Sequence, residues 1–309
     1  MLPILLGLVA AGVACVAYAA LIERNWFVRR SHVVPCLPSG APPMRILHIS
    51  DLHFRQGHRR KKRFLQRCAE TQPDLVVCTG DFLDHEDGIE TAVAAVGALK
   101  PRVAAMYVLG SHDYVASKPL NPLKYLRGPS NRKPFAGRAL PWEDLVARLE
   151  QAGWTLMINR ATTLEVKGLG TVDVVGLDDP HIGRDDLSVA SPRTAPGFRL
   201  GIVHSPDGAP PLAELGYDLI VCGHTHGGQL RVPGFGALVT NSTLHRRMAR
   251  GLHPMNGAWL HVSAGLGTST YAPVRFACRP EVCVLELVER MEQGPTGPAR
   301  GRDEATTRG

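Results

Sequence analysis

Five short polar motifs occur along this chain of 309 residues, and each of them directly follows a run of apolar residues. In order, they are Asp51-Leu52-His53, Gly80-Asp81-Phe82-Leu83-Asp84, Gly110-Ser111-His112-Asp113, His204 and Gly223-His224-Thr225-His226. The apolar runs are nearly continuous, which is typical of strands buried on both faces in a sheet layered with helices. We therefore expect an α/β fold whose polar motifs lie on loops at the ends of its strands.

The apolar runs that precede the motifs are 46–50, 75–79, 104–109, 200–203 and 219–222, and further strands are predicted at 172–177, 260–263 and 282–288. Residues 60–71 and 142–152 place their apolar side chains on one face of a helix. Strands alternate with helices early in the chain and follow one another later. This order predicts a layered α/β domain.

The motifs supply carboxylate and imidazole groups and no cysteine, and this ligand set suits Mn, Fe or Zn alike. Asp81 can bridge two metals through its two carboxylate oxygens, and the spacing of His224 and His226 lets their rings reach different metals. Two divalent ions roughly 3.5–4 Å apart can hold a hydroxide and neutralise a phosphoryl group attacked in line. The motifs therefore predict a dinuclear centre that hydrolyses phosphoesters.

Residues 1–23 begin the chain with an apolar segment in which residues 2–22 carry no charge. About 20 such residues are enough for a helix to cross a bilayer, so we expect a single transmembrane anchor. Arg24, Arg29 and Arg30 follow the span and nothing basic precedes it, which favours a cytoplasmic domain. The alternative is a cleaved signal peptide and an exported domain, because Ala17-Tyr18-Ala19 resembles a processing site.

The remainder divides into a Pro-, Ser- and Gly-containing linker at 24–43, a domain at 44–289 and a disordered tail at 290–309. Seven cysteines without CxxC spacing favour a reducing compartment. The segment 115–141 contains six lysines and arginines and no acid. It is interpreted either as a solvated loop or as a rim that attracts an anionic substrate or lipid headgroups.

Together the five motifs resemble the calcineurin-like metallophosphoesterase superfamily, whose pattern is D-x-H, G-D-x-x-D, G-N-H-E/D, H and G-H-x-H. The resemblance covers 46–287 and implies a four-layer α/β/β/α sandwich with the site at the sheet edges. The extended Gly223–Gln229 motif and the stretch 263–276 look like the membrane-associated bacterial branch. That branch includes enzymes that hydrolyse the UDP-2,3-diacylglucosamine pyrophosphate bond.

Carried over residue by residue, the resemblance assigns a role to most of the motif residues. Two divalent metal ions would be held by Asp51, His53 and His226 on one side, by His204 and His224 on the other, and by Asp81 as the bridge. His112 would protonate the leaving oxygen, and Asp84 would orient its imidazole. Asp113 either binds a metal or contacts a residue that binds a metal, and the resemblance leaves both roles open.

Ser111 departs from the family pattern, which has a metal-binding Asn at this position. A serine hydroxyl is shorter and a poorer ligand, so the second metal is held weakly or through a water in this hypothesis. The leading prediction is a membrane-anchored hydrolase of an anionic phosphodiester or pyrophosphate, with lipid-linked and nucleotide-linked substrates as the favoured classes. The alternative is a catalytically weak metal-binding scaffold of the same fold. No nucleic-acid partner is expected, because no aromatic residues interleave the basic ones.

Overall fold

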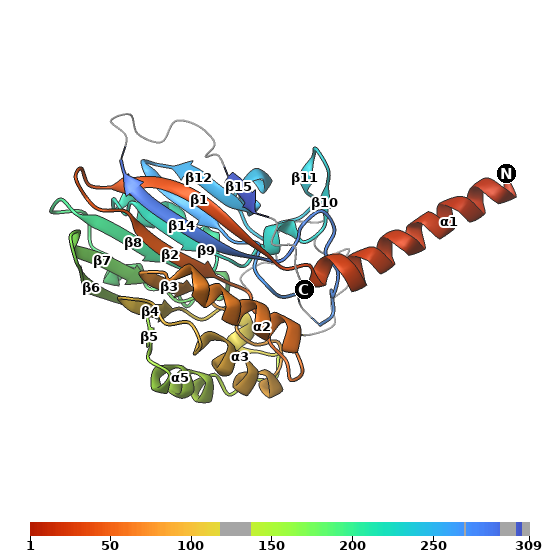
Figure 1. Cartoon of the computed structure of the whole chain (residues 1–309), viewed down its shortest axis with the longest axis horizontal. Coiled ribbons are helices and arrows are strands. Elements are labelled where there is room, and N and C mark those ends of the chain that lie inside the picture. Colours follow the sequence, from red (N-terminus) through yellow and green to blue (C-terminus); the bar gives the residue numbers. More distant parts are fainter. Residues whose placement is uncertain (118–136, 269, 291–300, 305–309) are drawn as a thin grey trace.

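Two mixed β-sheets form the centre of the computed structural model, which describes residues 1–117, 137–268, 270–290 and 301–304 (Figure 1). The large sheet has the order β15 (Gly301–Glu304), β1 (Val28–Leu37), β14 (Glu281–Glu289), β2 (Met44–Ile49), β3 (Leu75–Cys78), β4 (Ala104–Tyr107) and β5 (Trp154–Leu156). The second sheet has the order β12 (Gly251–Met255), β13 (Ala258–Val262), β9 (Leu219–Cys222), β8 (Phe198–Ile202), β7 (Gly170–Gly176) and β6 (Arg160–Val166). A small hairpin joins β10 (Arg231–Val232) to β11 (Gly236–Ala237).

Alternate residues of the central strands point into different cores. Leu75 and Val77 of β3 pack between the two sheets with Leu200 and Val221, whereas Val76 packs under the helices. The outer face of the large sheet is covered by α2 (Arg59–Arg67), α3 (Ile89–Val96) and α5 (Trp142–Gln151). The short α6 (Ala209–Glu214) packs on the second sheet. The α/β fold with two sheets is thus confirmed.

All eight strands predicted from apolar runs are present, as β2, β3, β4, β8, β9, β7, β13 and β14. The two predicted helices are α2, which continues as a 3-10 turn at Cys68–Thr71, and α5. In each sheet the strands that precede the motifs run parallel: β2, β3 and β4 in one, β8 and β9 in the other. Their carboxyl ends therefore lie at a common edge.

The linker predicted at 24–43 is instead largely a strand of the large sheet. β1 runs parallel to β14 from Val28 onward, and its side chains Val34, Cys36 and Leu37 are buried in the core between the sheets. Pro35 is tolerated because β15 pairs only with residues 29–32, so no strand among the described residues needs a hydrogen bond from residue 35 on that side. Within the predicted disordered tail, residues 301–304 form β15, and 291–300 and 305–309 lie outside the described residues.

The apolar N-terminal segment is helical. Helix α1 (Leu2–Ala17) continues through a π-helical turn (Tyr18–Ile22) and a 3-10 turn (Glu23–Asn25), giving an apolar helix over Leu2–Asn25. By length and composition it could cross a membrane, and it is either a membrane anchor or a signal sequence. It projects away from the domain (Figure 1). Its last turns nevertheless belong to the domain, since buried Glu23 accepts the backbone N–H groups of Ala277 (3.0 Å) and Cys278 (2.6 Å).

The position of β1 predicts that residues 28–37 are required for folding. A chain that begins at Met44 should unfold at a clearly lower temperature than one that begins at Val28, or precipitate, because it exposes the edge of β14 and the core beneath β1. Each buried Val or Leu contributes roughly 1.5–3 kcal/mol. Thermal unfolding followed by circular dichroism measures the difference. The two chains are matched, since both lack the apolar helix and Glu23, and equal melting temperatures would show that β1 is dispensable.

Candidate metal centre

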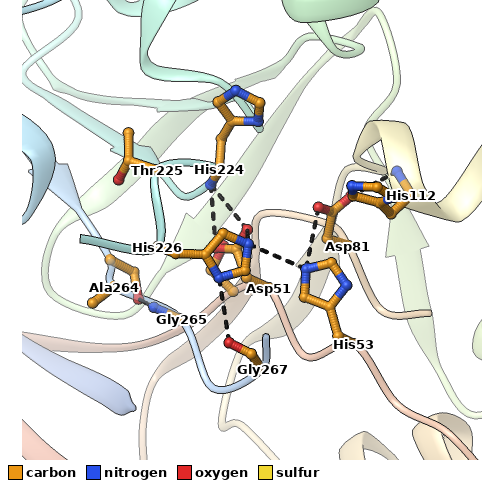
Figure 2. Close-up of polar contacts among 12 residues, drawn as sticks. Asp51, His53, Asp81, His112, His224, Thr225, His226, Ala264, Gly265 and Gly267 are labelled. Atoms are coloured by element: carbon orange, nitrogen blue, oxygen red, sulfur yellow. Dashed lines mark hydrogen bonds and ion pairs between the residues drawn. The ribbon is translucent and has the colours of Figure 1, made fainter. Parts of the chain in front are cut away.

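The polar motifs come together at the common edge of the two sheets. Asp51 and His53 follow β2, Asp81 and Asp84 follow β3, and residues 110–113 follow β4. From the second sheet, His204 follows β8, and His224 and His226 follow β9. The six predicted ligands are buried or, for His226, half-buried. Figure 2 shows Asp51, His53, Asp81 and His226 directed toward one another.

Asp81 lies between imidazoles from the two sheets. Its Oδ2 is 3.5 Å from Nε2 of His53 and 3.5 Å from Nε2 of His204. Its Oδ1 accepts the backbone N–H of His112 at 2.9 Å. One oxygen of Asp81 thus faces both rings, and the other holds the backbone of the neighbouring motif, so bridging through both oxygens stays a prediction.

Asp51, His53, Asp81 and His226 form a compact donor group. Their ligand atoms all lie within 4.8 Å of one another, and Nε2 of His53 is 3.3 Å from Nε2 of His226. Nδ1 of His226 lies 3.3 Å from the carbonyl oxygen of Gly267, to which it can donate. With the proton on Nδ1, the lone pair of the ring is on Nε2, which lies 3.6 Å from Asp51 Oδ1. That lone pair, with the facing Nε2 of His53 and two carboxylates beside it, suits a divalent cation.

The second half of the centre is only partly assembled. His204 donates through Nδ1 to the carbonyl oxygen of Thr79 (2.6 Å), which turns its buried Nε2 toward Asp81 Oδ2, 3.5 Å away. The ring of His224 packs against that of His204, with 5.2 Å between centroids. However, Nε2 of His224 lies 3.1 Å from the carbonyl oxygen of Asn241, and Figure 2 shows this ring turned away from His226.

Burial and neighbouring carboxylates set the charge states of the site. Burial lowers the pKa of His53, His224 and His226, which keeps these rings neutral and able to donate a lone pair. Burial also acts to lower the pKa of His204, but Asp81 and Asp179 outweigh it and raise that pKa well above its usual value. The pKa of Asp81 falls well below its ordinary value, since His204 and His112 overcome the effect of burial. A positive charge on His204 is thus favoured beside the negative charge of Asp81.

Five of the six predicted ligands adopt a left-handed backbone, which few residues other than glycine occupy. The φ angles are 49° for Asp51, 41° for His53, 54° for Asp81, 68° for His224 and 51° for His226. Each such residue costs about 1 kcal/mol or more, and clusters of them occur at functional sites. Hydrogen bonds between the loops hold them in place: Asp51 donates to the carbonyl of Gly80 (3.0 Å), and His53 to that of Asp81 (2.9 Å).

His112 and Asp84 are connected through a residue that the sequence did not indicate. Nδ1 of His112 is 3.1 Å from the Ser117 hydroxyl, which donates to Asp84 Oδ1 at 3.0 Å. The His112 ring also lies beside His53, with 5.3 Å between centroids. An adjoining cleft of about 500 Å³ is lined by Arg55, Asp84, His85, Ala116, Ser117, Arg138, Thr270 and Tyr271. The remainder of the basic segment, residues 118–136, lies outside the described residues.

Asp113 and Ser111 have different surroundings. The carboxylate of Asp113 accepts the backbone N–H groups of Gly110 and Leu83, both at 3.0 Å, so it holds the turn rather than facing the donor group. Ser111 is buried in the first turn of the short helix α4 (Ser111–Tyr114). Gly110 precedes it, and any Cβ there would overlap Asp81 Oδ1 and the His204 ring.

Arg275 is a further component of the centre that no sequence pattern indicates. Its side chain is fully buried, and its guanidinium donates to the carbonyl oxygens of Ala264 (2.7 Å) and Gly267 (2.6 Å). Gly267 is the residue whose carbonyl contacts His226 Nδ1. Arg275 therefore fixes the loop that orients a predicted ligand.

The opposite pKa shifts predict different pH dependences for the two halves of the centre. Because the raised pKa of His204 favours its protonated form, a metal must displace that proton, and the metal affinity should rise with pH through the neutral window, by at most about tenfold per pH unit. His53 and His226 have lowered pKa values, so they are already neutral in that window and their metal should bind without this dependence.

Calorimetric titration with Mn²⁺ in buffers of different protonation enthalpy measures both the affinity and the protons released. His204→Ala serves as the matched variant, and the site that remains in it should release no proton. Metal binding that weakens as the pH rises, or equal proton release in the variant, would contradict this account.

Comparison with known proteins agrees with this geometry. Residues 44–228, more than half of the chain, match the model of the calcineurin-like phosphoesterase family. YkoQ of Bacillus subtilis (strain 168), described as an uncharacterized metallophosphoesterase, is 28% identical over 79% of this chain and 83% of its own length. Phosphodiesterase YaeI of Escherichia coli (strain K12) is 27% identical over 88% of this chain and 92% of its own.

A third relative is the UDP-2,3-diacylglucosamine pyrophosphatase LpxG of Chlamydia trachomatis, 28% identical over 79% of this chain and 84% of its own length. Among solved structures, TT1561 of Thermus thermophilus aligns with a TM-score of 0.40 at 12% identity, over 73% of this chain and 91% of that one. The family match and the buried Asp/His site agree, and the chain belongs to the calcineurin-like phosphoesterase family as a metal-dependent phosphoesterase.

Proposed function

We propose that this protein hydrolyses a phosphodiester or pyrophosphate of a lipid-linked or nucleotide-linked substrate at a dinuclear metal centre. The observation that carries the proposal is the position of Asp81, whose Oδ2 lies 3.5 Å from an imidazole nitrogen of each sheet. A carboxylate oxygen shared by two histidines is suited to bridging two cations. The donor set of carboxylates and imidazoles fits Mn, Fe or Zn.

The proposed ligands follow from the two halves of the site. Asp51, His53 and His226 hold one ion, His204 and His224 hold the other, and Asp81 is shared. When bound, two such ions lower the pKa of water and neutralise the phosphoryl group. His224 would have to rotate its ring away from Asn241 to take part, and Ser111 offers less support than an amide would.

His112 is the proposed proton donor to the leaving oxygen. Its ring lies beside His53 at the edge of the donor group, and its backbone N–H is fixed by Asp81. Ser117 positions the imidazole through Nδ1, and Asp84 orients the Ser117 hydroxyl. Asp84 is in turn held by the backbone N–H of Thr270 at 3.3 Å. We thus assign Asp84 a positioning role that acts through Ser117.

The substrate class is inferred from the cleft and from the relatives. A volume of about 500 Å³ beside Asp84 and Ser117 accommodates the organic substituent of an ester. Arg55 and Arg138 at its rim attract an anion, although they also pair with Asp87 and Glu86. LpxG is described as a pyrophosphatase of a diacylated sugar nucleotide, and YaeI as a phosphodiesterase, which supports a diester or pyrophosphate with a lipid part.

We further propose that the apolar helix is retained as a single membrane span with the domain on the cytoplasmic side. The hairpin of β10 and β11 lies beside the end of this helix, since Leu230 bridges to Phe276 and the Phe276 ring contacts Tyr18. Four side chains around the hairpin are both apolar and exposed: Leu230, Val232, Phe235 and Leu238. Arginines stack on exposed aromatic rings here, Arg246 on Phe235 and Arg279 on Trp26, as is typical of a surface that contacts lipid headgroups.

Hydrolysis of bis-p-nitrophenyl phosphate by the full chain with Mn²⁺ tests the enzymatic proposal. Asp81→Ala and His224→Ala should each lower kcat/KM at least about 100-fold, a loss of about 2.7 kcal/mol in transition-state stabilisation. Asp144→Ala is the control, because this carboxylate is half-exposed on helix α5 and pairs with Arg148 of the same helix. Its rate should stay within about twofold of the native rate.

A native protein that binds two metals but cleaves neither this diester nor p-nitrophenyl phosphate would contradict the proposal. The scaffold hypothesis then gains support, and Ser111→Asn distinguishes the two. If the missing amide ligand limits catalysis, this substitution restores hydrolysis. If the protein is a scaffold, activity stays absent.

The membrane proposal predicts where a polarity-sensitive dye senses a bilayer. Cys15 is the one exposed cysteine of the seven, all of which the structure describes, so it can be labelled selectively in the α1 helix. In protein reconstituted into phospholipid vesicles, a dye at Cys15 should emit strongly and at shorter wavelength. In the Cys15→Ser background, Leu238→Cys should respond similarly and Leu187→Cys, exposed at 37% on a distant 3-10 turn, should not. Equal responses at all three positions would refute the proposal that the helix and the hairpin, but not the rest of the domain, contact the bilayer.

A further inference from the structure

A second group of metal-binding side chains lies between the two sheets, separate from the Asp/His centre. His32 comes from β1, Cys283 from β14 and His261 from β13. One ligand atom of each lies within 4.8 Å of the other two. His261 and Cys283 are fully buried, and His32 is half-buried, which leaves a route from solvent.

A chain of hydrogen bonds from Asp51 fixes the protonation of the neighbouring His48. The Ser50 hydroxyl donates to Asp51 Oδ2 (2.6 Å), and the Thr79 hydroxyl donates to Ser50 Oγ (2.7 Å). The single proton of the Thr79 hydroxyl is therefore used. Because Thr79 Oγ1 also lies 3.1 Å from Nε2 of His48, that nitrogen must be the donor.

The same chain then determines which nitrogen of His261 carries a lone pair. The His48 ring is fully buried, and with the proton on Nε2 its Nδ1 is an acceptor. Nδ1 of His48 lies 2.8 Å from Nδ1 of His261, which must therefore donate. The lone pair of His261 is left on Nε2, a buried atom with no hydrogen-bond partner among the described residues.

We propose that His32, His261 and Cys283 bind a Zn²⁺ ion at this position between the sheets. Imidazole and thiolate together are the ligands that zinc prefers, and they differ from the carboxylates and imidazoles of the phosphoesterase centre. A metal-bound histidine usually donates its other ring N–H to a fixed partner, as His261 does to His48. A buried lone pair without a donor is otherwise unfavourable.

The charges around the site are compatible with a cation. Glu281 lies two residues before Cys283 on β14, is 1% exposed, and pairs with Arg30 at 2.7 Å and Arg250 at 4.0 Å. Burial and Glu281 raise the pKa of the Cys283 thiol, so it keeps its proton until a metal binds. Zinc binding forms the bond to sulfur and releases that proton to solvent. The ion would join β1 and β14 of the large sheet to β13 of the second sheet.

Cobalt substitution tests this site independently of the phosphoesterase centre. The full chain, stripped of metal, is titrated with Co²⁺ while its absorption spectrum is recorded. Only a sulfur ligand gives a thiolate-to-cobalt charge-transfer band in the near ultraviolet, and the Asp/His centre contains none. The native protein and Cys36→Ser should show the band, since Cys36 is equally buried on β1 but outside the group, whereas Cys283→Ser should lose it.

Two further variants keep the outcome decisive. Asp81→Asn should retain the band and one equivalent of bound zinc, because it alters only the phosphoesterase centre. His32→Gln replaces the half-buried member of the three proposed ligands, so this substitution should disturb folding least. It should weaken zinc binding at least about tenfold. Absence of the band in native protein that has bound cobalt, or its persistence in folded Cys283→Ser, overturns the proposal.

Discussion

The carboxylate of Asp51 ties the two sheets together at the edge where the chemistry is placed. It follows β2 of the large sheet, and its oxygens accept the backbone N–H of His224 at 3.0 and 3.2 Å, at the end of β9 in the second sheet. The same carboxylate accepts the Ser50 hydroxyl and faces His226. One side chain thus sets the spacing between loops that are 173 residues apart in the chain. The neighbouring ligands depend on that spacing.

The central strands and the polar motifs were predictable because each signal is local. A run such as 75–79 is nearly continuously apolar, and this pattern alone is enough to predict a strand that is buried on both faces. Parallel strands then bring their carboxyl ends to one edge, so Asp51 and Asp81 had to lie near each other. The grouping of the predicted ligands could therefore be expected from the motifs before their distances were known.

The elements that were missed depend on contacts distant in sequence. β1 contains Pro35 and a mixture of polar residues, and only its pairing with β14 about 250 residues later makes it a strand. Ser117 connects His112 to Asp84 only once the loops are folded. Arg275 belongs to no motif, and its role becomes visible through the carbonyl groups that surround it. The left-handed backbone of the ligands is likewise imposed by the tertiary structure, since aspartate and histidine do not favour it alone.

The same non-local contacts connect the apolar helix to the ligands. Glu23, at the end of that helix, accepts the backbone N–H groups of Ala277 and Cys278, and Arg275 in the same loop fixes Gly267 beside His226. The buried carboxylate of Glu23 holds this loop to the end of the helix, because its loss would leave both backbone donors without partners. The loop that orients His226 therefore depends on the last turns of the helix. This makes the helix end a component of the domain, joined to the loop of His226 through Cys278, whose backbone N–H contacts Glu23 and whose thiol contacts the His226 carbonyl oxygen.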